Sequence, residues 1–355
     1  MIKKTISLRS LIYFSVCSFP LFSASIISAY SQQMPKNMKD KTSTKQMKGM
    51  GGKMMSNDGL VPPGIMVGET GKWMAGYQAM FDNMKGNLIG SDRISEAKIL
   101  QQFMAAPTDM KMQMHMGMIM YAPSNRLTLM TMVPYIRKSM NHVMNNGMRF
   151  NELTKGIGDI ELRGLYSLSQ SKNFKNRLLM NLGVTLPTGS INERMGNMRL
   201  EYPMQLGSGT VALSPGITYF VQSKPWGWGA EFIPMFQIGK NKNGYRLGNI
   251  YKPNIWVARQ LASWISISAK ANGEIWQNIQ GSDAMLDVMD EPTKDPTLQG
   301  GKRLDFILGM NIYPKVGFLN QSQFFIQALK PVLQSLDGPQ LKKQSVIKLG
   351  WQLEF

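Results

Sequence analysis

From Gly71 onward, apolar and polar residues alternate along the chain with a period of two. Between Trp73 and Phe81 the odd-numbered positions are apolar, and Lys72, Gly76, Gln78, Asp82 and two methionines occupy the other face. The same alternation returns at 159–168, 177–186, 265–275 and 303–313. Successive side chains of a β-strand point to opposite faces, so each run predicts a strand with two different faces.

The lengths of these runs and of their connections favour a membrane barrel over a soluble sandwich. Each run has about ten residues, which is what a tilted strand needs to cross a bilayer. Short connections at 122–126, 170–176, 222–225 and 263–264 separate longer ones at 83–109, 138–157, 187–208 and 278–302. This rhythm is typical of short periplasmic turns and longer outer loops.

The sequence therefore predicts an all-β fold, a closed antiparallel transmembrane β-barrel of about twelve strands. The last strand ends on Phe355, and a terminal aromatic residue is typical of chains addressed to barrel assembly in the outer membrane. Ten or fourteen strands remain open, because one run contains Pro253 and another is short. We expect strands near 72–82, 110–121, 127–137, 158–169, 177–186, 209–221, 226–238, 250–262, 265–277, 303–313, 322–329 and 345–355.

The residues before the barrel divide into two segments. Lys3, Lys4 and Arg9 precede an apolar run that serines and Pro20 interrupt, which predicts a cleaved signal peptide over 1–31 rather than a membrane anchor. Residues 32–68 form a segment rich in Met, Lys and Gly that we expect to be a flexible periplasmic tail. The barrel would then occupy 69–355.

Composition adds a positive charge and excludes several classes of protein. The chain has 355 residues, 43% hydrophobic and 17% charged, a mixture too polar for a bundle of transmembrane helices and too apolar for disorder. Two histidines and one cysteine exclude a Cys/His metal centre or a disulfide framework. Of the net charge of +18, residues 1–56 account for +8, and the rest of the chain keeps +10.

We expect the positive body to contact outer-membrane lipid and the phosphates of lipopolysaccharide, and the nascent chain to meet the outer-membrane assembly machinery. Nucleic acid is not an expected partner, since export removes the chain from it and no basic recognition helix is present.

Several segments carry a resemblance to a known family. They are Gly156-Ile-Gly-Asp-Ile-Glu-Leu162, Gly183-Val-Thr-Leu-Pro-Thr-Gly189, Glu201-Tyr-Pro-Met-Gln-Leu-Gly-Ser-Gly-Thr210, Gln280-Gly-Ser-Asp283, Asp295-Pro-Thr-Leu-Gln-Gly-Gly301 and Gly338-Pro-Gln-Leu341. From about residue 60 to its end, the chain resembles the outer-membrane protein family of the phenol meta-cleavage pathway. The segment Phe103–Met116 resembles a Met-rich branch of this family, called transporters. The resemblance implies an outer-membrane barrel that transports small, often hydrophobic compounds, and it supplies no catalytic residues.

Methionine is the unusual residue type, and 22 of the 31 methionines lie between Met34 and Met148. Six of them occupy alternate positions on one face of the expected strand 110–121, and His115 lies on the opposite face of the same strand. Two more lie on the strand 127–137, which we expect to pair with it as a hairpin. If the methionines point inward, their thioethers suit Cu(I) or Ag(I) as bound or conducted ions. If they point outward, they are lipid-facing or packing residues. The tentative metal ligands are Met110, Met112, Met114, Met116, Met118, Met120, Met130, Met132 and His115.

Charged residues on the polar faces of the strands predict a wetted lumen, either as a self-paired interior or as a constriction that selects solutes. This lumen set consists of Asp159, Glu161, Arg163, Glu231, Lys270, Glu274, Arg303, Asp305, Lys348 and Glu354.

We expect a channel or transporter for small solutes, either hydrophobic or aromatic compounds or soft metal ions. The alternative is a non-conducting barrel that binds Cu or Ag or is structural. An enzyme is not expected, because His142 is placed in a loop and no nucleophile motif accompanies it. No cofactor is expected, since a soft ion would be a ligand or cargo.

Overall fold

The computed structural model describes Leu60 and residues 70–171 and 176–355. The predicted signal peptide and nearly all of the predicted tail lie outside the described residues, so these two assignments stay predictions. No helix in the described part of the chain is long and apolar enough to cross a membrane.

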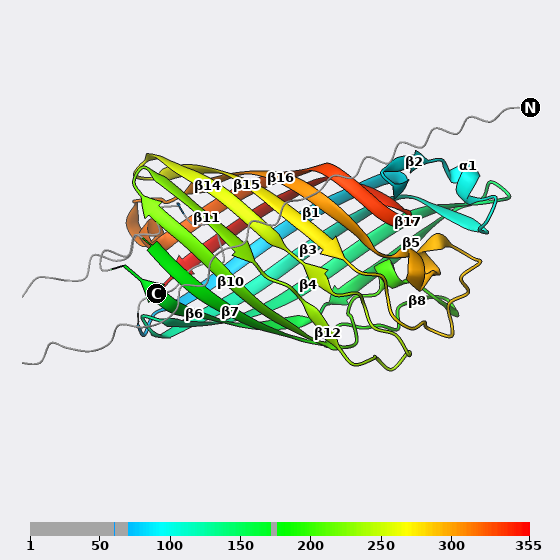
Figure 1. The fold of residues 1–355 in the computed structure, drawn as a ribbon, viewed down its shortest axis with the longest axis horizontal. Helices are drawn as coiled ribbons and strands as arrows, with labels where there is room; N and C mark the ends of the chain where they lie inside the picture. The colour runs from blue at the N-terminus through cyan, green and yellow to red at the C-terminus, as the bar shows by residue number, and fades with distance from the viewer. Residues whose placement is uncertain (1–59, 61–69, 172–175) are drawn as a thin grey trace, which may run out of the picture. The chain divides into compact units, whose positions relative to one another are not determined.

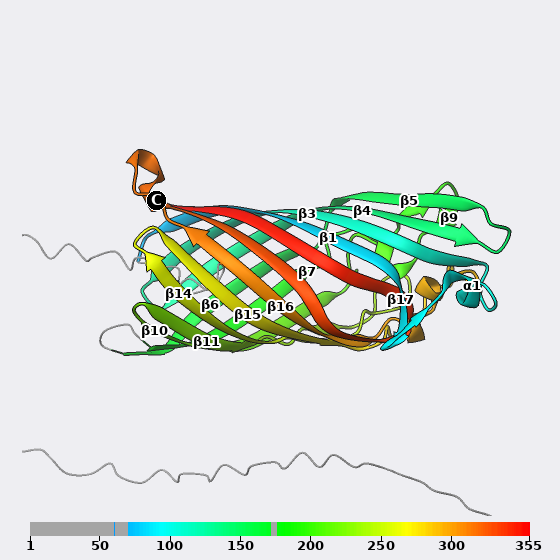
Figure 2. The same ribbon diagram turned by 90° about the horizontal axis from the view of Figure 1, so that it is seen from above.

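The described residues form a closed antiparallel β-barrel, which confirms the predicted fold class (Figures 1 and 2). Each strand of the ring is hydrogen-bonded to the next, and the last strand returns to β1. The ring consists, in spatial order, of β1 (Trp73–Gly90), β3 (Ala105–Ser124), β4 (Leu127–Met144), β6 (Ile160–Gln170), β7 (Asn176–Leu186), β10 (Val211–Ser223), β11 (Trp226–Phe232), β14 (Pro253–Ala262), β15 (Ile265–Trp276), β16 (Gly301–Ile312) and β17 (Ser322–Glu354).

The long element β17 supplies two of the barrel's walls. Its first part pairs antiparallel with β16 and its second part pairs antiparallel with β1. Because the intervening strands alternate in direction around the ring, these two parts must run in opposite directions. The Gln334 side chain bridges them by donating to the Lys343 carbonyl and accepting from the Lys343 backbone N–H. Eleven named elements of the described chain thus provide the twelve strands that the sequence predicts.

Smaller elements extend the barrel at the end with the long loops. Short strands add to the sheet as β2 (Asp92–Ile94), β5 (Arg149–Ile157), β12 (Phe236–Ile238) and β13 (Ile250–Tyr251), while β8 (Arg194–Met195) and β9 (Met198–Arg199) form a separate hairpin. The helical turns at this end are α1 (Glu96–Ile99), η1 (Tyr202–Met204), η2 (Pro292–Lys294) and η3 (Pro296–Leu298), whereas η4 (Gly317–Gln321) connects β16 to β17 at the opposite end, near the C-terminus.

Two predicted loops are wrong in extent, because the strands continue further. Strand β1 runs to Gly90 and β3 begins at Ala105, which shortens the expected loop 83–109. The expected loop 138–157 is a hairpin of β4 and β5 with a tight turn at Gly147, whose φ is +83°. The sequence Asn-Asn-Gly at this turn is a recognised turn signal that predicts such a hairpin.

The two faces of the strands have different surroundings. On the outer face, Ile119 is 57% exposed, Leu182 52% and Leu308 56%, as expected for side chains that contact lipid. Trp226, Trp228 and Trp264 are exposed at strand ends, which suits an interfacial girdle. Trp256, in contrast, is buried against Leu179 and Phe220. The ring of Trp256 fits there because the facing Gly229 has no side chain.

The barrel closes where its last strand, β17, pairs with its first strand, β1. Trp73 and Phe355 exchange two backbone hydrogen bonds of 2.9 and 2.8 Å, and the Phe355 ring is exposed on the outside. We expect deletion of Phe355 to lower the heat-modifiable folded band in membrane fractions, because the deletion removes both bonds and the terminal aromatic ring. Phe355→Tyr should fold normally, and unchanged folding after deletion would reject Phe355 as an assembly signal.

Candidate functional site

The methionine ladder lies on the inner face of the barrel, which resolves the two alternatives left open by the sequence. Met110, Met118 and Met120 are 4%, 7% and 3% exposed, whereas the intervening Lys111 and Ile119 are exposed. Inner methionines of the neighbouring strands complete the same surface, and we call it the methionine wall. It comprises Met74, Met80 and Met84 on β1, Met110, Met112, Met114, Met116, Met118 and Met120 on β3, and Met130, Met132 and Met140 on β4.

The methionine wall has two packed ends and an open centre. Met74, Met118, Met120 and Met130 pack together near the short turns, with Met132 against them. Towards the long loops the wall packs against Leu200 and Met204 of the loop between β7 and β10. Between these clusters the thioethers of Met114 and Met116 line a cavity. His115 does not share this surface, because it lies on the outer face, where its Nδ1 is 2.6 Å from the Tyr77 hydroxyl.

Charged side chains gather on another part of the inner surface, mainly on β15, β16 and the second arm of β17. Arg303 binds Asp305 at 2.9 Å and also contacts Glu274, which lies 3.7 Å from Lys252. Lys270 and Lys348 lie on the same inner faces of β15 and β17. These ion pairs form one network along the lumen.

The other residues of the predicted lumen set lie apart from that network. Glu231 accepts hydrogen bonds from Thr218 and Asn254 across the neighbouring strands. Glu161 and Arg163 pair with each other on β6. Lys343, which the sequence reasoning missed, binds the buried Asp82 at 2.7 Å and carries the charged surface to the edge of the methionine wall.

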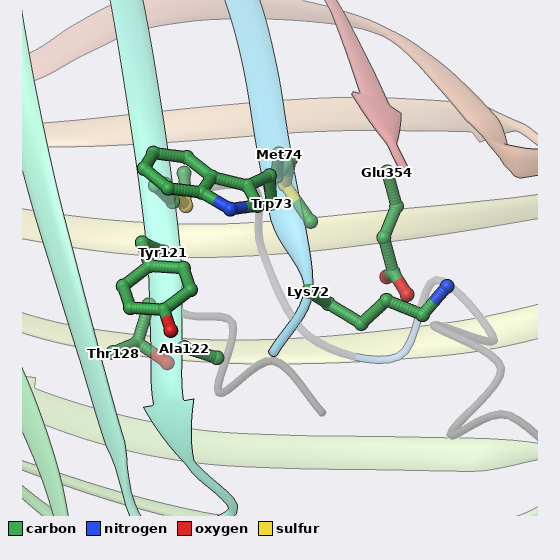
Figure 3. A pocket seen from close by; sticks show the side chains of 8 residues that line it. Lys72, Trp73, Met74, Tyr121, Ala122, Thr128 and Glu354 are labelled. Atoms are coloured by element: carbon green, nitrogen blue, oxygen red, sulfur yellow. The ribbon is translucent and has the colours of Figure 1, made fainter. Parts of the chain in front are cut away.

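A small pocket near the short turns contains Glu354, another residue of the predicted lumen set. Figure 3 shows Glu354 beside Lys72, with Met74 and Trp73 on the adjacent strand. The pocket encloses about 10 Å³, which holds little more than one water molecule. It therefore offers no room for a solute.

The loop between β7 and β10 folds inward and narrows the lumen. Lys138 on β4 donates to the carbonyls of Pro203 and Gln205 at 2.7 and 2.6 Å. Thr154 on β5 donates to the Met204 carbonyl at 3.0 Å. These bonds hold the centre of the loop against the barrel wall, and we call residues 187–210 the constriction loop.

Asp159 clamps both ends of the constriction loop. Its carboxylate accepts hydrogen bonds from the backbone N–H of Gly189, and from the backbone N–H and hydroxyl of Ser208, at 2.9, 2.8 and 2.7 Å. The two ends of the loop also touch at Gly189 and Gly207, where a Cβ on either residue would lie within 2.8 Å of the other backbone. Glycine is required at this close approach.

The other long loops pack over the constriction loop. Tyr202 packs edge-on against Tyr245, and its hydroxyl accepts a hydrogen bond from the Asp283 backbone. Burial raises the pKa of both phenols, that of Tyr245 to about 12, so both are neutral. The segments that carry the family resemblance thus meet at this end: Asp159 comes from one, Gly189 from a second, Ser208 from a third and Asp283 from a fourth.

A cavity of about 660 Å³ lies inside the barrel, next to the constriction loop. Met114 and Met116 line one side and Glu274, Arg303 and Lys343 another, while Tyr202, Gln205 and Leu206 of the constriction loop border it. This volume lies within the range of small-molecule sites. We take this cavity with its two kinds of wall as the candidate functional site.

The structure also brings together a group that the sequence reasoning missed. His142 lies on β4, not in a loop as predicted, and its neighbours are Glu152 on β5 and Glu201 on the constriction loop. All three side chains are buried. No spacing in the sequence signals this group, since its members come from three separate segments.

The comparisons with known proteins agree with the fold. The COG4313 outer membrane channel from Pseudomonas putida F1 matches 83% of this chain and 99% of its own, with a TM-score of 0.59 and 14% identity. The translocator domain of the autotransporter NalP from Neisseria meningitidis matches 82% of this chain and 91% of its own, with a TM-score of 0.44 and 10% identity. The likeness to the COG4313 channel agrees with the barrel fold described above.

A family model identifies the relationship more closely. The model described as "Putative MetA-pathway of phenol degradation" matches residues 116–296, just over half of the chain. The chain belongs to this family. No curated protein matches it.

Proposed function

We propose that the protein is a channel or transporter for small solutes in the outer membrane of a Gram-negative bacterium. The observation that carries this proposal is the cavity of about 660 Å³ inside the closed barrel, bounded by the methionine wall, the charged network and the constriction loop. A barrel filled only for structural reasons would pack its interior with side chains, as small barrels do.

The walls of the cavity favour solutes with an apolar part and a polar group. Thioethers are soft and make favourable contacts with aromatic rings. The nearby Arg303 and Lys343 supply hydrogen-bond donors that would orient a hydroxyl or carboxylate. The family description refers to phenol degradation, which is consistent with small aromatic compounds.

Soft metal ions are the second candidate cargo, because the twelve inner thioethers of the methionine wall share one surface. Thioether ligands select Cu(I) and related ions. In this proposal the ion is cargo, the barrel has no cofactor and performs no catalysis. A signal peptide would direct export, and the basic body would contact lipopolysaccharide.

Single-channel recording of the purified full-length protein in planar bilayers tests the proposal. We expect discrete conductance steps, and faster swelling of loaded proteoliposomes in small phenols than in a disaccharide, which has no apolar part for the methionine wall to contact. Empty bilayers and a heat-denatured sample are the controls. A folded protein with no conductance and no solute uptake would favour the non-conducting, metal-binding or structural alternative.

A further inference from the structure

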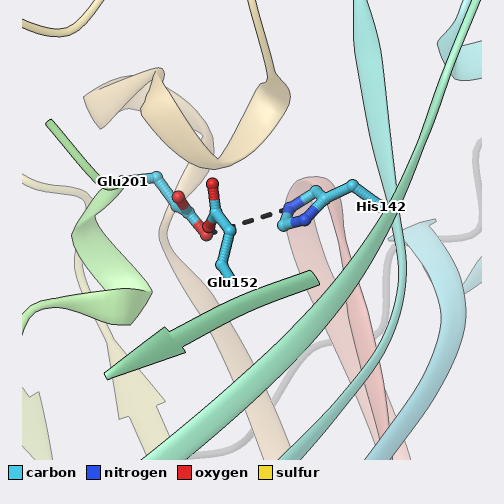
Figure 4. A group of neighbouring side chains, drawn as sticks. All are labelled: His142, Glu152 and Glu201. Carbon is cyan, nitrogen blue, oxygen red and sulfur yellow. Dashed lines mark ion pairs between the residues drawn. The ribbon is translucent and has the colours of Figure 1, made fainter. Parts of the chain in front are cut away.

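His142, Glu152 and Glu201 form a compact group of potential metal ligands beside the constriction loop (Figure 4). One ligand atom from each residue lies within 4.8 Å of the others. The His142 side chain is fully buried, as is that of Glu201, and Glu152 is 4% exposed. Figure 4 shows the imidazole directed at the two carboxylates, which belong to different segments of the chain.

These buried polar atoms lack the hydrogen bonds that such atoms normally make. The two ring nitrogens of His142, the two carboxylate oxygens of Glu201 and Oε2 of Glu152 make no well-formed hydrogen bond, although His142 Nε2 lies 3.3 Å from Glu291 Oε2 in an ion pair. Buried polar atoms are nearly always paired, and an exception indicates strain or an absent water or ion. Carboxylates accept but do not donate, so Glu152 and Glu201 cannot satisfy each other unless one takes up a proton.

The charges around the group also leave it short of a cation. Among the described residues, the other titratable side chains that act on the group are Lys138 on β4, and Glu291 and Lys294 on the loop between β15 and β16. The Lys138 ammonium donates to the carbonyls of Pro203 and Gln205 rather than to a carboxylate of the group. Lys294 binds Asp290 at 3.0 Å and lies 3.9 Å from Glu291.

We propose that His142, Glu152 and Glu201 bind one divalent transition-metal ion, best represented by Zn²⁺. Imidazole nitrogen and carboxylate oxygen are both ordinary zinc ligands, at about 2.0–2.2 Å from the ion. Two ligand atoms at that distance in tetrahedral geometry lie roughly 3.3 Å apart. The His142 Nε2 is 3.9 Å from Glu201 Oε1, so a small contraction forms the site.

Neighbouring residues support such a site. Glu291 Oε2 lies 3.3 Å from the same imidazole nitrogen and offers a fourth ligand, the third carboxylate. Thr293 donates to Glu291, and Phe150 stacks on the imidazole at 4.9 Å, so both side chains are held in place. The carboxylates of Glu152 and Glu201 and one divalent ion are neutral together, and the third carboxylate, Glu291, lies 3.9 Å from the Lys294 ammonium, so the cost of burying unpaired charges falls. The ion would join β4, β5 and the constriction loop.

Metal binding to the intact folded protein in detergent tests this assignment. After removal of metal by a chelator, we expect titration with Zn²⁺ to show one tight site per chain. Glu201→Gln should weaken binding at least about a hundredfold, since even changes outside the ligand shell cost 10–100-fold. Glu193→Gln is the matched control, because it makes the same change in the same loop outside the group. Zn²⁺ should raise the melting temperature of the wild type but not of Glu201→Gln.

The result is interpretable even where one variant folds poorly. Heat-modifiable migration reports folding, and Glu152→Gln provides a second loss of a ligand. Replacing methionines of the wall should leave Zn²⁺ binding unchanged, which separates this site from any soft-metal site in the lumen. A folded wild type that takes up no Zn²⁺, or equal affinity in folded Glu201→Gln or Glu152→Gln, would overturn the assignment whether or not the barrel conducts.

Discussion

Asp159→Ala should conduct several times more current than the wild type. The Asp159 carboxylate accepts three hydrogen bonds from the two ends of the constriction loop. Hydrogen bonds to a charged group contribute about 1.5–3 kcal/mol each, so the substitution removes a large part of the energy that holds the loop inward. The loop would then spend more time outside the lumen, because its two ends lose their clamp, while Lys138 and Thr154 still hold its centre.

Single-channel recording of Asp159→Ala and uptake of a small phenol into proteoliposomes measure this effect. Asp287→Ala is a suitable control, because Asp287 lies in another long loop and its carboxylate accepts one hydrogen bond, from the Met289 backbone. Both variants should show the same heat-modifiable migration as the wild type. Equal conductance in folded Asp159→Ala would show that the constriction loop does not limit passage.

The barrel could be predicted from sequence because lipid and lumen impose a strict period of two on every strand. Ile119, Leu182 and Leu308 follow this rule on the outer face. The extent of the loops could not be predicted as well, since β1, β3 and β4 continue beyond the part that alternates most clearly. In these extensions the strands are stabilised by backbone hydrogen bonds to their neighbours rather than by contact with lipid.

The orientation of the methionine ladder could not be decided from residue type. Lys111, Gln113 and His115 are more polar than the alternating methionines, which favoured methionine outside. The structure reverses this, because His115 binds the Tyr77 hydroxyl on the outer face. The signal in favour of the inner face was in the neighbouring strand β1, where Met74, Met80 and Met84 share the face of Gln78 and Asp82.

The constriction loop and the buried group lay beyond sequence reasoning for another reason. Asp159 meets Gly189 and Ser208, and His142 meets Glu201, through long-range contacts that no local pattern encodes. The resemblance did select the right segments, although it assigned them no roles. Their common position at one end of the lumen explains why they share a family pattern.

The methionine wall supports the second large effect, on the binding of a soft ion. Met112, Met114 and Met116 occupy the centre of the wall, and two of them line the cavity. Each soft ion needs several sulfur ligands, so removal of three adjacent thioethers breaks the wall into separate ends. Leucine nearly preserves the volume and hydrophobicity of methionine, so the barrel should still fold.

We expect the triple variant Met112→Leu, Met114→Leu, Met116→Leu to bind fewer Ag(I) ions per chain, and about tenfold more weakly, equivalent to a loss of about 1.4 kcal/mol. Calorimetric titration of the folded proteins measures both quantities. The control is the triple variant Met180→Leu, Met198→Leu, Met289→Leu, whose methionines are exposed outside the methionine wall. Equal Ag(I) stoichiometry and affinity in both variants would make the wall an apolar surface for organic solutes. A selective loss would instead identify the lumen as a soft-ion site, because only the thioether sulfurs differ between the two proteins at the cavity.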